Sequence, residues 1–284
     1  MSGLTVVIPA RDEEDGLAVT LAALRAIEPR LGLPLEILVV DDGSHDGTRR
    51  VATDAGVRVC AHPASAGYGR SLKTGLAAAS HDLIAIMDAD GTYPVEELPA
   101  MLALAERFDV VVGARTGPHF RRERRSPTQA TFLLLTNFVT GRRLPDPNSG
   151  FRVFRRADVL PIIDRLPNGF SFTTTMSLVL TLSGKFFYFH PIEYRPRIGS
   201  SKVRFVRDAL RAGQGMLEVI LRYNPLKAFI AFAFVPLVVA GVVALLPLAS
   251  GTKLVAITAA LVTACTIFAV GMAAVAIAGA QRHR

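Results

Sequence analysis

Short apolar runs alternate with amphipathic stretches through the first part of the chain. The runs have the length and composition of buried strands, and they cover residues 4–9, 35–40, 57–60, 84–87 and 109–113. The stretches between them have the polar starts and apolar spacing of helices. This alternation predicts an α/β domain with a mostly parallel, doubly wound sheet and right-handed crossovers.

Charged residues follow three of these predicted strands. They are Arg11 to Asp15 after the first strand, Asp41 and Asp42 after the second, and Asp88 and Asp90 after the fourth. The carboxyl ends of parallel strands form the ligand crevice of open α/β sheets. We therefore predict a functional crevice at this edge.

Asp88 and Asp90 are the most informative of these residues. With alternating side chains, two residues separated by Ala89 leave a strand on the same side. Two carboxylates at the open end of a strand suit Mg²⁺ or Mn²⁺ with a diphosphate as a further ligand. The alternative interpretation is a polar turn with no ligand.

The C-terminal part is far more apolar. Residues 228–249 and 254–280 carry no charge, and about 22 helical residues span roughly 33 Å, enough for a hydrocarbon core of about 30 Å. We predict a transmembrane hairpin. Basic residues flank it on one side, whereas Lys253 lies between the spans, so the positive-inside rule places the catalytic domain in the cytoplasm.

Residues 205–224 have an apolar stripe and basic residues at one end. This pattern predicts an amphipathic helix in the membrane interface, and the alternative is a helix packed on the domain. The predicted organisation is a catalytic domain at 1–204, the interfacial helix at 205–224 and the transmembrane hairpin at 225–284.

Charge and cysteine content narrow the choice of partners. The chain has 284 residues and a formal charge of +8, which suits nucleic acid, anionic lipid or a phosphorylated substrate. No nucleic-acid-binding motif is present, so we expect no nucleic-acid partner. Cys60 and Cys265 lie far apart and predict no disulfide, and the start of the chain leads directly into a strand, so we expect no signal peptide.

Two basic segments belong to the soluble part. Residues 119–125 predict a mobile loop that is either a lid on anionic ligands or a solvated charge run. A second basic series lies between residues 195 and 211, where a lipid phosphate would meet the protein.

Seven ordered motifs carry a resemblance to a known family. They occupy residues 7–14, 39–48, 67–75, 87–94, 113–115, 148–152 and 194–202. The chain resembles family 2 glycosyltransferases of the GT-A fold. More closely, it is similar to the polyprenyl-phosphate hexosyltransferases, the group of dolichol-phosphate mannose synthase and the undecaprenyl-phosphate glucosyltransferases. That group also carries two terminal transmembrane helices.

The resemblance implies a membrane-anchored enzyme that moves a hexose from GDP-mannose or UDP-glucose to a dolichyl or undecaprenyl phosphate, with inversion. It implies Mg²⁺ or Mn²⁺ at Asp88 and Asp90, catalytic roles for Asp90 and Arg115, and a two-helix anchor compatible with homo-oligomers. The implied donor- and phosphate-binding residues are Pro9, Ala10, Arg11, Glu13, Asp41, Asp42, Lys73, Asp88, Ser149, Gly150, Arg197 and Lys202.

Thr92 departs from the pattern of the mannose synthases, in which this position is usually Gln and a further metal ligand. The departure leaves the sugar and the metal ligands open. Another donor, such as UDP-N-acetylglucosamine, and a non-catalytic module that binds nucleotide sugar or lipid remain alternatives. A processive polysaccharide synthase is disfavoured, because it needs a tryptophan-containing element and the chain has no Trp.

Overall fold

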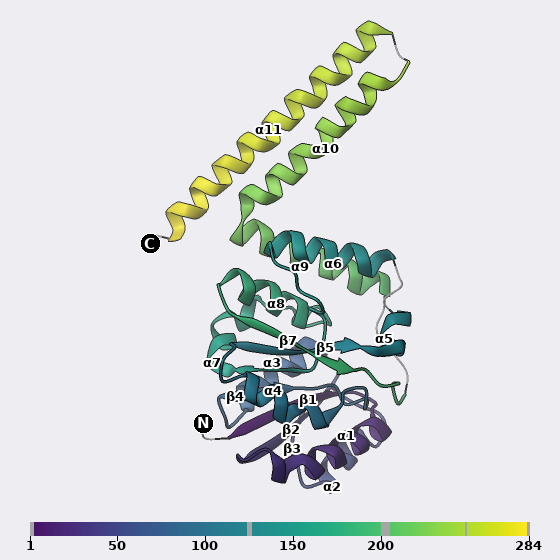
Figure 1. Cartoon of the computed structure of the whole chain (residues 1–284), viewed down its shortest axis with the longest axis vertical. Coiled ribbons are helices and arrows are strands. Elements are labelled where there is room, and N and C mark those ends of the chain that lie inside the picture. The colour runs from purple at the N-terminus through teal and green to yellow at the C-terminus, as the bar shows by residue number, and fades with distance from the viewer. Residues whose placement is uncertain (1–2, 124–126, 200–204, 248, 283–284) are drawn as a thin grey trace. The chain divides into compact units, whose positions relative to one another are not determined.

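A seven-stranded sheet forms the centre of the N-terminal part (Figure 1). The computed structural model describes residues 3–123, 127–199, 205–247 and 249–282. The strand order is β3-β2-β1-β4-β6-β5-β7, and only β6 runs antiparallel to its neighbours. The strands are β1 (Leu4–Ala10), β2 (Leu35–Asp41), β3 (Arg58–Ala61), β4 (Leu83–Ile86), β5 (Val110–Thr116), β6 (Arg152–Arg155) and β7 (Phe187–Glu193). The predicted mostly parallel sheet is confirmed.

Helices cover both faces of this sheet. On one face, α1 (Glu14–Ile27), α2 (Thr48–Asp54) and α4 (Leu98–Leu104) share a buried core with alternate residues of β1 and β2 such as Val6 and Val39. On the other face, α3 (Tyr68–Ala78) packs so closely that a Cβ at Gly75 would lie 2.2 Å from Val7 Cγ1. Alternating strand residues therefore fill two cores, as both-sided burial of a parallel sheet requires.

Shorter elements complete the domain. They are η1 (Glu28–Arg30), η2 (Val95–Glu97), α7 (Arg156–Val159), η3 (Leu160–Arg165) and α8 (Phe172–Leu182). Helix α8 contacts α3, and its side chains are buried almost throughout.

Two local predictions in the sheet domain are wrong. β4 ends at Ile86, so Asp88 and Asp90 lie in the following loop, and the conformation of that loop rather than strand alternation brings them together. The basic segment begins with a helix, α5 (Gly117–Glu123), where we predicted a loop. Pro118 at the start of α5 favours helix, because its φ angle is already helical. Helix α6 (Pro127–Thr140), which follows, has no counterpart among the predicted elements.

The C-terminal unit is helical. Helix α9 (Phe205–Tyr223) confirms that residues 205–223 are helical, as predicted. Contacts divide the chain into compact units at 1–215 and 216–284, so the division falls inside α9. Helices α10 (Pro225–Leu245) and α11 (Ser250–Arg282) pair closely, and a Cβ at Gly271 would lie 2.4 Å from Phe229 Cβ. The connection lies before Ser250 and not at 250–253 as predicted, because Pro247 cannot continue α10.

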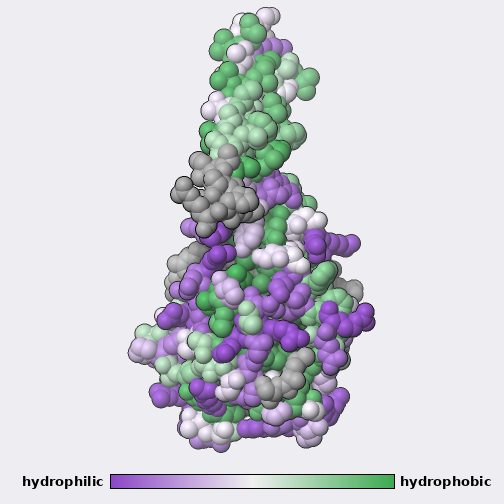
Figure 2. Space-filling view, turned by 90° about the vertical axis from the view of Figure 1, so that its left-hand side faces the viewer, coloured by the Kyte–Doolittle hydropathy of each residue, from purple (hydrophilic) through white to green (hydrophobic). Residues whose placement is uncertain are grey.

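Both hairpin helices have the length and composition to cross a membrane. The mean hydropathy is 2.7 for Pro225–Leu245 and 2.3 for Ser250–Ala273. Figure 2 shows apolar side chains covering the hairpin surface, and large ones such as Leu245 and Val255 are exposed. Exposed apolar surface of this extent is typical of lipid-facing helices.

Candidate active site

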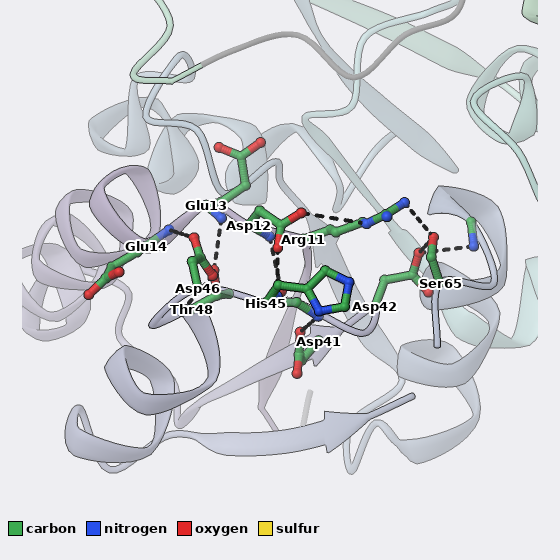
Figure 3. Close-up of polar contacts among 12 residues, drawn as sticks. Arg11, Asp12, Glu13, Glu14, Asp41, Asp42, His45, Asp46, Thr48 and Ser65 are labelled. Atoms are coloured by element: carbon green, nitrogen blue, oxygen red, sulfur yellow. Dashed lines mark hydrogen bonds and ion pairs between the residues drawn. The ribbon is translucent and has the colours of Figure 1, made fainter. Parts of the chain in front are cut away.

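The loops after β1 and β2 are joined by hydrogen bonds (Figure 3). Asp12, which has a φ of 46°, donates its N–H to Ser44 Oγ (3.0 Å), and its Oδ1 accepts from the His45 N–H (2.7 Å). The Glu13 N–H donates to Thr48 Oγ1 (2.8 Å). These bonds fix the two predicted nucleotide loops as one unit.

Asp42 has a structural role in this region. Its carboxylate accepts from the N–H groups of Ala66 (2.8 Å) and Gly67 (3.0 Å) and from Ser65 Oγ (2.8 Å), and it contacts His62 Nδ1 (2.8 Å). Burial raises the pKa of Asp42, but these bonds outweigh it and hold the pKa below its usual value. The carboxylate thus holds the segment that leads into α3, which sequence reasoning did not anticipate.

Asp41 and Arg11 complete this side of the crevice. Asp41 is buried at the end of β2, and its Oδ1 accepts from the Ser44 N–H (3.0 Å). Arg11 is partly exposed and donates from Nη1 to Ser65 Oγ (2.7 Å). Pro9 and Ala10 lie buried at the end of β1, with Ala10 in register with Asp41.

Asp88 is half-buried, with its carboxylate held between two glycine-containing segments. Its Oδ1 accepts from the Tyr68 hydroxyl at the start of α3 (2.9 Å). A Cβ at Gly150 would lie only 2.8 Å from both carboxylate oxygens. Burial raises the pKa of Asp88 to about 6, and the charge of Asp90 adds to this rise.

Asp90 is almost completely buried, with a relative accessibility of 2%. Its Oδ1 accepts from both the N–H (3.1 Å) and the hydroxyl (2.6 Å) of Thr92. Its Oδ2 lies 2.5 Å from Arg197 Nη2 in an ion pair, and it has no regular hydrogen bond to the described residues. The Thr92 side chain therefore positions Asp90, and one carboxylate oxygen is left facing a cation.

The segment after β7 is attached to the Asp90 loop through its backbone. The Arg195 N–H donates to Thr92 O (2.9 Å), and the Ile198 N–H donates to Asp90 O (3.1 Å). This attachment places Arg197 at the carboxylates, although more than 100 residues separate them in sequence. Glu13 lies close to the same segment, and its charge acts on Arg197.

Arg115 is held in a bidentate ion pair. Its Nε and Nη2 donate to Asp146 Oδ2 (2.8 Å) and Oδ1 (2.9 Å), and its guanidinium lies 4.7 Å from the centre of the Phe120 ring and 5.4 Å from that of Tyr194. Burial lowers the pKa of Arg115, but Asp146 raises it well above its usual value. The sequence analysis did not single out Asp146, which lies two residues before the 148–152 motif.

The 146–152 segment is built around a buried arginine. Arg152 is fully buried and donates to the carbonyls of Ser149 and Pro147 and to Ser177 Oγ. Burial lowers the pKa of Arg152 to about 10. Ser149 donates to Gly113 O (2.6 Å), and the Gly150 N–H donates to the Tyr93 hydroxyl (2.7 Å).

The last two predicted binding residues are Lys73 and Lys202. Lys73 is in the second turn of α3, where burial lowers its pKa, Asp164 raises it and Arg70 lowers it. Lys202 lies outside the described residues. Among the predicted site residues, Asp88, Asp90, Gly150 and Arg197 lie close together in the structure.

The paired carboxylates fit a divalent cation. Burial raises the pKa of Asp88, repulsion from the charge of Asp90 raises it further, and Asp90 Oδ2 is buried beside the Arg197 guanidinium. The described residues contain no cluster of three or more His, Cys, Asp or Glu side chains suited to a metal. A site of two carboxylates suits Mg²⁺ or Mn²⁺, which keep water and phosphate oxygens as further ligands.

Comparison with known proteins decides the family. The sequence model described as "Glycosyl transferase family 2" matches residues 5–160, which is more than half of the chain. The chain belongs to glycosyl transferase family 2. The match includes Asp41, Asp42, Asp88, Asp90 and Arg115.

Curated relatives of this family 2 member are named as transferases to undecaprenyl phosphate. The undecaprenyl-phosphate 4-deoxy-4-formamido-L-arabinose transferase of Salmonella paratyphi A is 30% identical over 72% of this chain. The match spans only 63% of that relative's length. The undecaprenyl-phosphate mannosyltransferase of Micrococcus luteus is 31% identical over 69% of this chain and 86% of its own. The predicted resemblance to the polyprenyl-phosphate group is confirmed.

Solved structures confirm the GT-A fold. Glucosyl-3-phosphoglycerate synthase from Mycobacterium tuberculosis, in complex with Mn²⁺, UDP and glucosyl-3-phosphoglycerate, has a TM-score of 0.62 at 19% identity, covering 77% of this chain and 80% of its own. Mannosyl-3-phosphoglycerate synthase from Rubrobacter xylanophilus has a TM-score of 0.59 at 20% identity, covering 78% of this chain and 73% of its own.

Proposed function

We propose that this chain transfers a sugar from a nucleotide sugar to a polyprenyl phosphate at a membrane. The observation that carries the proposal is the meeting of Asp88 and Asp90 with Arg197 at the carboxyl end of the sheet, the edge at which open α/β sheets bind their ligands. Relatives named as undecaprenyl-phosphate transferases support the acceptor. A hexose donor such as GDP-mannose or UDP-glucose is the narrower proposal, which the mannosyltransferase relative favours.

The proposed site supplies positioning and charge. Asp88 and Asp90 would hold Mg²⁺ or Mn²⁺, which when bound neutralises the leaving diphosphate. Tyr68 and Thr92 orient the two carboxylates through the hydrogen bonds described above. Burial raises the pKa of Asp88, and the positive charge of Arg115, which Asp146 holds in place, offsets part of this rise.

The acceptor needs no strong general base. The second pKa of a phosphate monoester is near 6, so an acceptor phosphate is already largely dianionic at neutral pH. Its oxygen would attack the anomeric carbon while the bond to the diphosphate breaks, which inverts the configuration. The enzyme then contributes mainly orientation and electrostatic stabilisation.

Two exposed apolar surfaces support attachment to a membrane, one on the α10–α11 hairpin and one on helix α6. The α10–α11 hairpin has spans of sufficient length. Arg222 precedes it and Lys227 lies in its first turn, so we propose two transmembrane helices and a cytoplasmic catalytic domain. Helix α6 adds exposed Leu134, Leu135 and Phe138, with Leu134 at 70% relative accessibility. Arg142 and Arg143, both exposed, follow α6 and suit anionic lipid.

Substitution of Asp90 tests the proposed chemistry. Asp90→Asn preserves shape but removes the negative charge, so we expect near-complete loss of lipid-dependent nucleoside diphosphate release. Asp54→Asn removes a carboxylate that is 66% exposed and should retain normal turnover. Wild-type turnover in Asp90→Asn would contradict the metal role, and saturable donor binding without turnover in the wild-type protein would support a non-catalytic module.

A further inference from the structure

Arg197 forms an ion pair with Asp90 Oδ2, the oxygen of Asp90 that a bound metal would coordinate. Both hydrogen bonds donated by Thr92 go to Asp90 Oδ1, at 3.1 Å and 2.6 Å. The other oxygen, Oδ2, is buried and faces Arg197 Nη2 at 2.5 Å. A divalent cation bound to Oδ2 would be repelled by the positive guanidinium beside it, so the two cations would compete for this oxygen.

Arg197 can leave this oxygen without disturbing the backbone around it. The Arg195 and Ile198 N–H groups hold the segment to Thr92 O and Asp90 O through main-chain atoms alone. Ile198 also packs on the loop, since a Cβ at Gly91 would lie 3.1 Å from Ile198 Cδ1. The Arg197 side chain is 32% exposed and therefore has a route towards solvent.

We propose that Arg197 is an exchangeable cation that couples the donor site to the acceptor site. Without a donor, its guanidinium neutralises Asp90 and holds the buried carboxylate in place. A divalent metal with its nucleoside diphosphate displaces it, and the released guanidinium then becomes a partner for the phosphate of the acceptor. This inference rests on the proposed function, and it predicts that the donor binds before the acceptor.

The chemistry of the two ligands fits this exchange. A divalent metal ion carries more positive charge than a guanidinium. Once it is bound, it neutralises Asp90, and the ion pair with Arg197 no longer stabilises the carboxylate. Arginine binds phosphate oxygens well, through paired N–H groups. The backbone hydrogen bonds of residues 195 and 198 keep the freed Arg197 side chain beside the crevice. The guanidinium is therefore available to the acceptor phosphate only after the donor and its metal are bound.

Mn²⁺ binding provides a readout that does not depend on turnover. The full-length protein in detergent would be titrated with Mn²⁺ alone, and free Mn²⁺ would be measured by electron paramagnetic resonance. Arg197→Met removes the competing charge, so Mn²⁺ should bind about twofold to fivefold more tightly, the range expected for one partly exposed ion pair. Arg195→Met is the matched control, because Arg195 pairs with Glu96 instead, and it should leave the Mn²⁺ affinity unchanged.

A second measurement tests the acceptor side. Binding of a short-chain polyprenyl phosphate to the wild-type protein should strengthen when Mn²⁺ and a nucleoside diphosphate are present. In Arg197→Met this strengthening should largely disappear, whereas Arg197→Lys, which keeps a positive charge, should retain part of it.

The outcomes separate the inference from the proposed function. Unchanged or weaker Mn²⁺ binding in Arg197→Met, with normal binding in the wild-type protein, would overturn the exchange and leave the metal site standing. Absence of Mn²⁺ binding in the wild-type protein and in both variants would contradict the metal site, and with it both proposals.

Discussion

A methyl group at position 150 tests the close packing around Asp88. In the structure, a Cβ at Gly150 would lie 2.8 Å from Asp88 Oδ1 and Oδ2 and 3.0 Å from its Cγ. Ordinary carbon–oxygen contacts are about 3.4 Å or longer. In Gly150→Ala the carboxylate must therefore retreat by about half an ångström.

The cost should fall on function more than on stability. The contacted atoms are the end of a side chain, so Asp88 can move while the backbone stays in place. Such a movement stretches the 2.9 Å bond from the Tyr68 hydroxyl and changes the spacing between Asp88 and Asp90. Because misplacement by about 1 Å can cost 10²-fold in rate, we expect turnover to fall by about tenfold to a hundredfold.

The assay is metal-dependent turnover, measured as kcat and as the Mn²⁺ concentration for half-maximal activity. Gly169→Ala is the matched control, because a Cβ there meets no atom within 4 Å. We expect Gly150→Ala to fold normally and to need more Mn²⁺, while Gly169→Ala behaves as the wild-type protein. A wild-type rate and Mn²⁺ requirement in Gly150→Ala would refute the importance of this packing.

Two further predictions concern the membrane surface and pH. The chain has no Trp, so Phe138→Trp places a single tryptophan on α6, and Phe186→Trp places one at an exposed site before β7. Brominated lipids in proteoliposomes should quench the tryptophan at 138 more strongly, and equal quenching would contradict the membrane contact of α6. Burial raises the pKa of Glu36, but hydrogen bonds from Thr5, Ser80 and Arg58 lower it to about 2. The gap from the usual 4.5 is worth about 3 kcal/mol, present above pH 4.5 and lost as pH falls towards 2. Glu36→Gln should therefore lower Tm at pH 7, by an amount that shrinks below pH 4.5; a pH-independent difference would contradict this.

The fold was predictable where local pattern and global structure agree. The strands that became β1 and β2 are continuous apolar runs, and the hairpin helices are long and uncharged. Such segments have few alternatives, because their side chains must be buried or face lipid. Helix α5 was missed because its basic residues suggested a solvated loop.

The site was predictable in its residues more than in their contacts. The positions of Asp88 and Asp90 follow from the sequence, but the ion pair between Asp90 and Arg197 depends on β7 returning beside β5. Likewise, Asp146 reaches Arg115 from 31 residues away, and Asp42 turns inward to bind the 65–67 segment. Nothing in local sequence pattern specifies such long-range pairs.

The most direct test of the central claim is a transfer assay with the full-length protein in detergent. Undecaprenyl or dolichyl phosphate and Mg²⁺ or Mn²⁺ would be supplied with GDP-mannose, UDP-glucose or UDP-N-acetylglucosamine in turn. We predict that one donor releases its nucleoside diphosphate only when the lipid phosphate is present, with a glycosyl phosphate lipid of inverted configuration as the product. Release that does not depend on the lipid, or transfer to a water-soluble acceptor instead, would contradict the account.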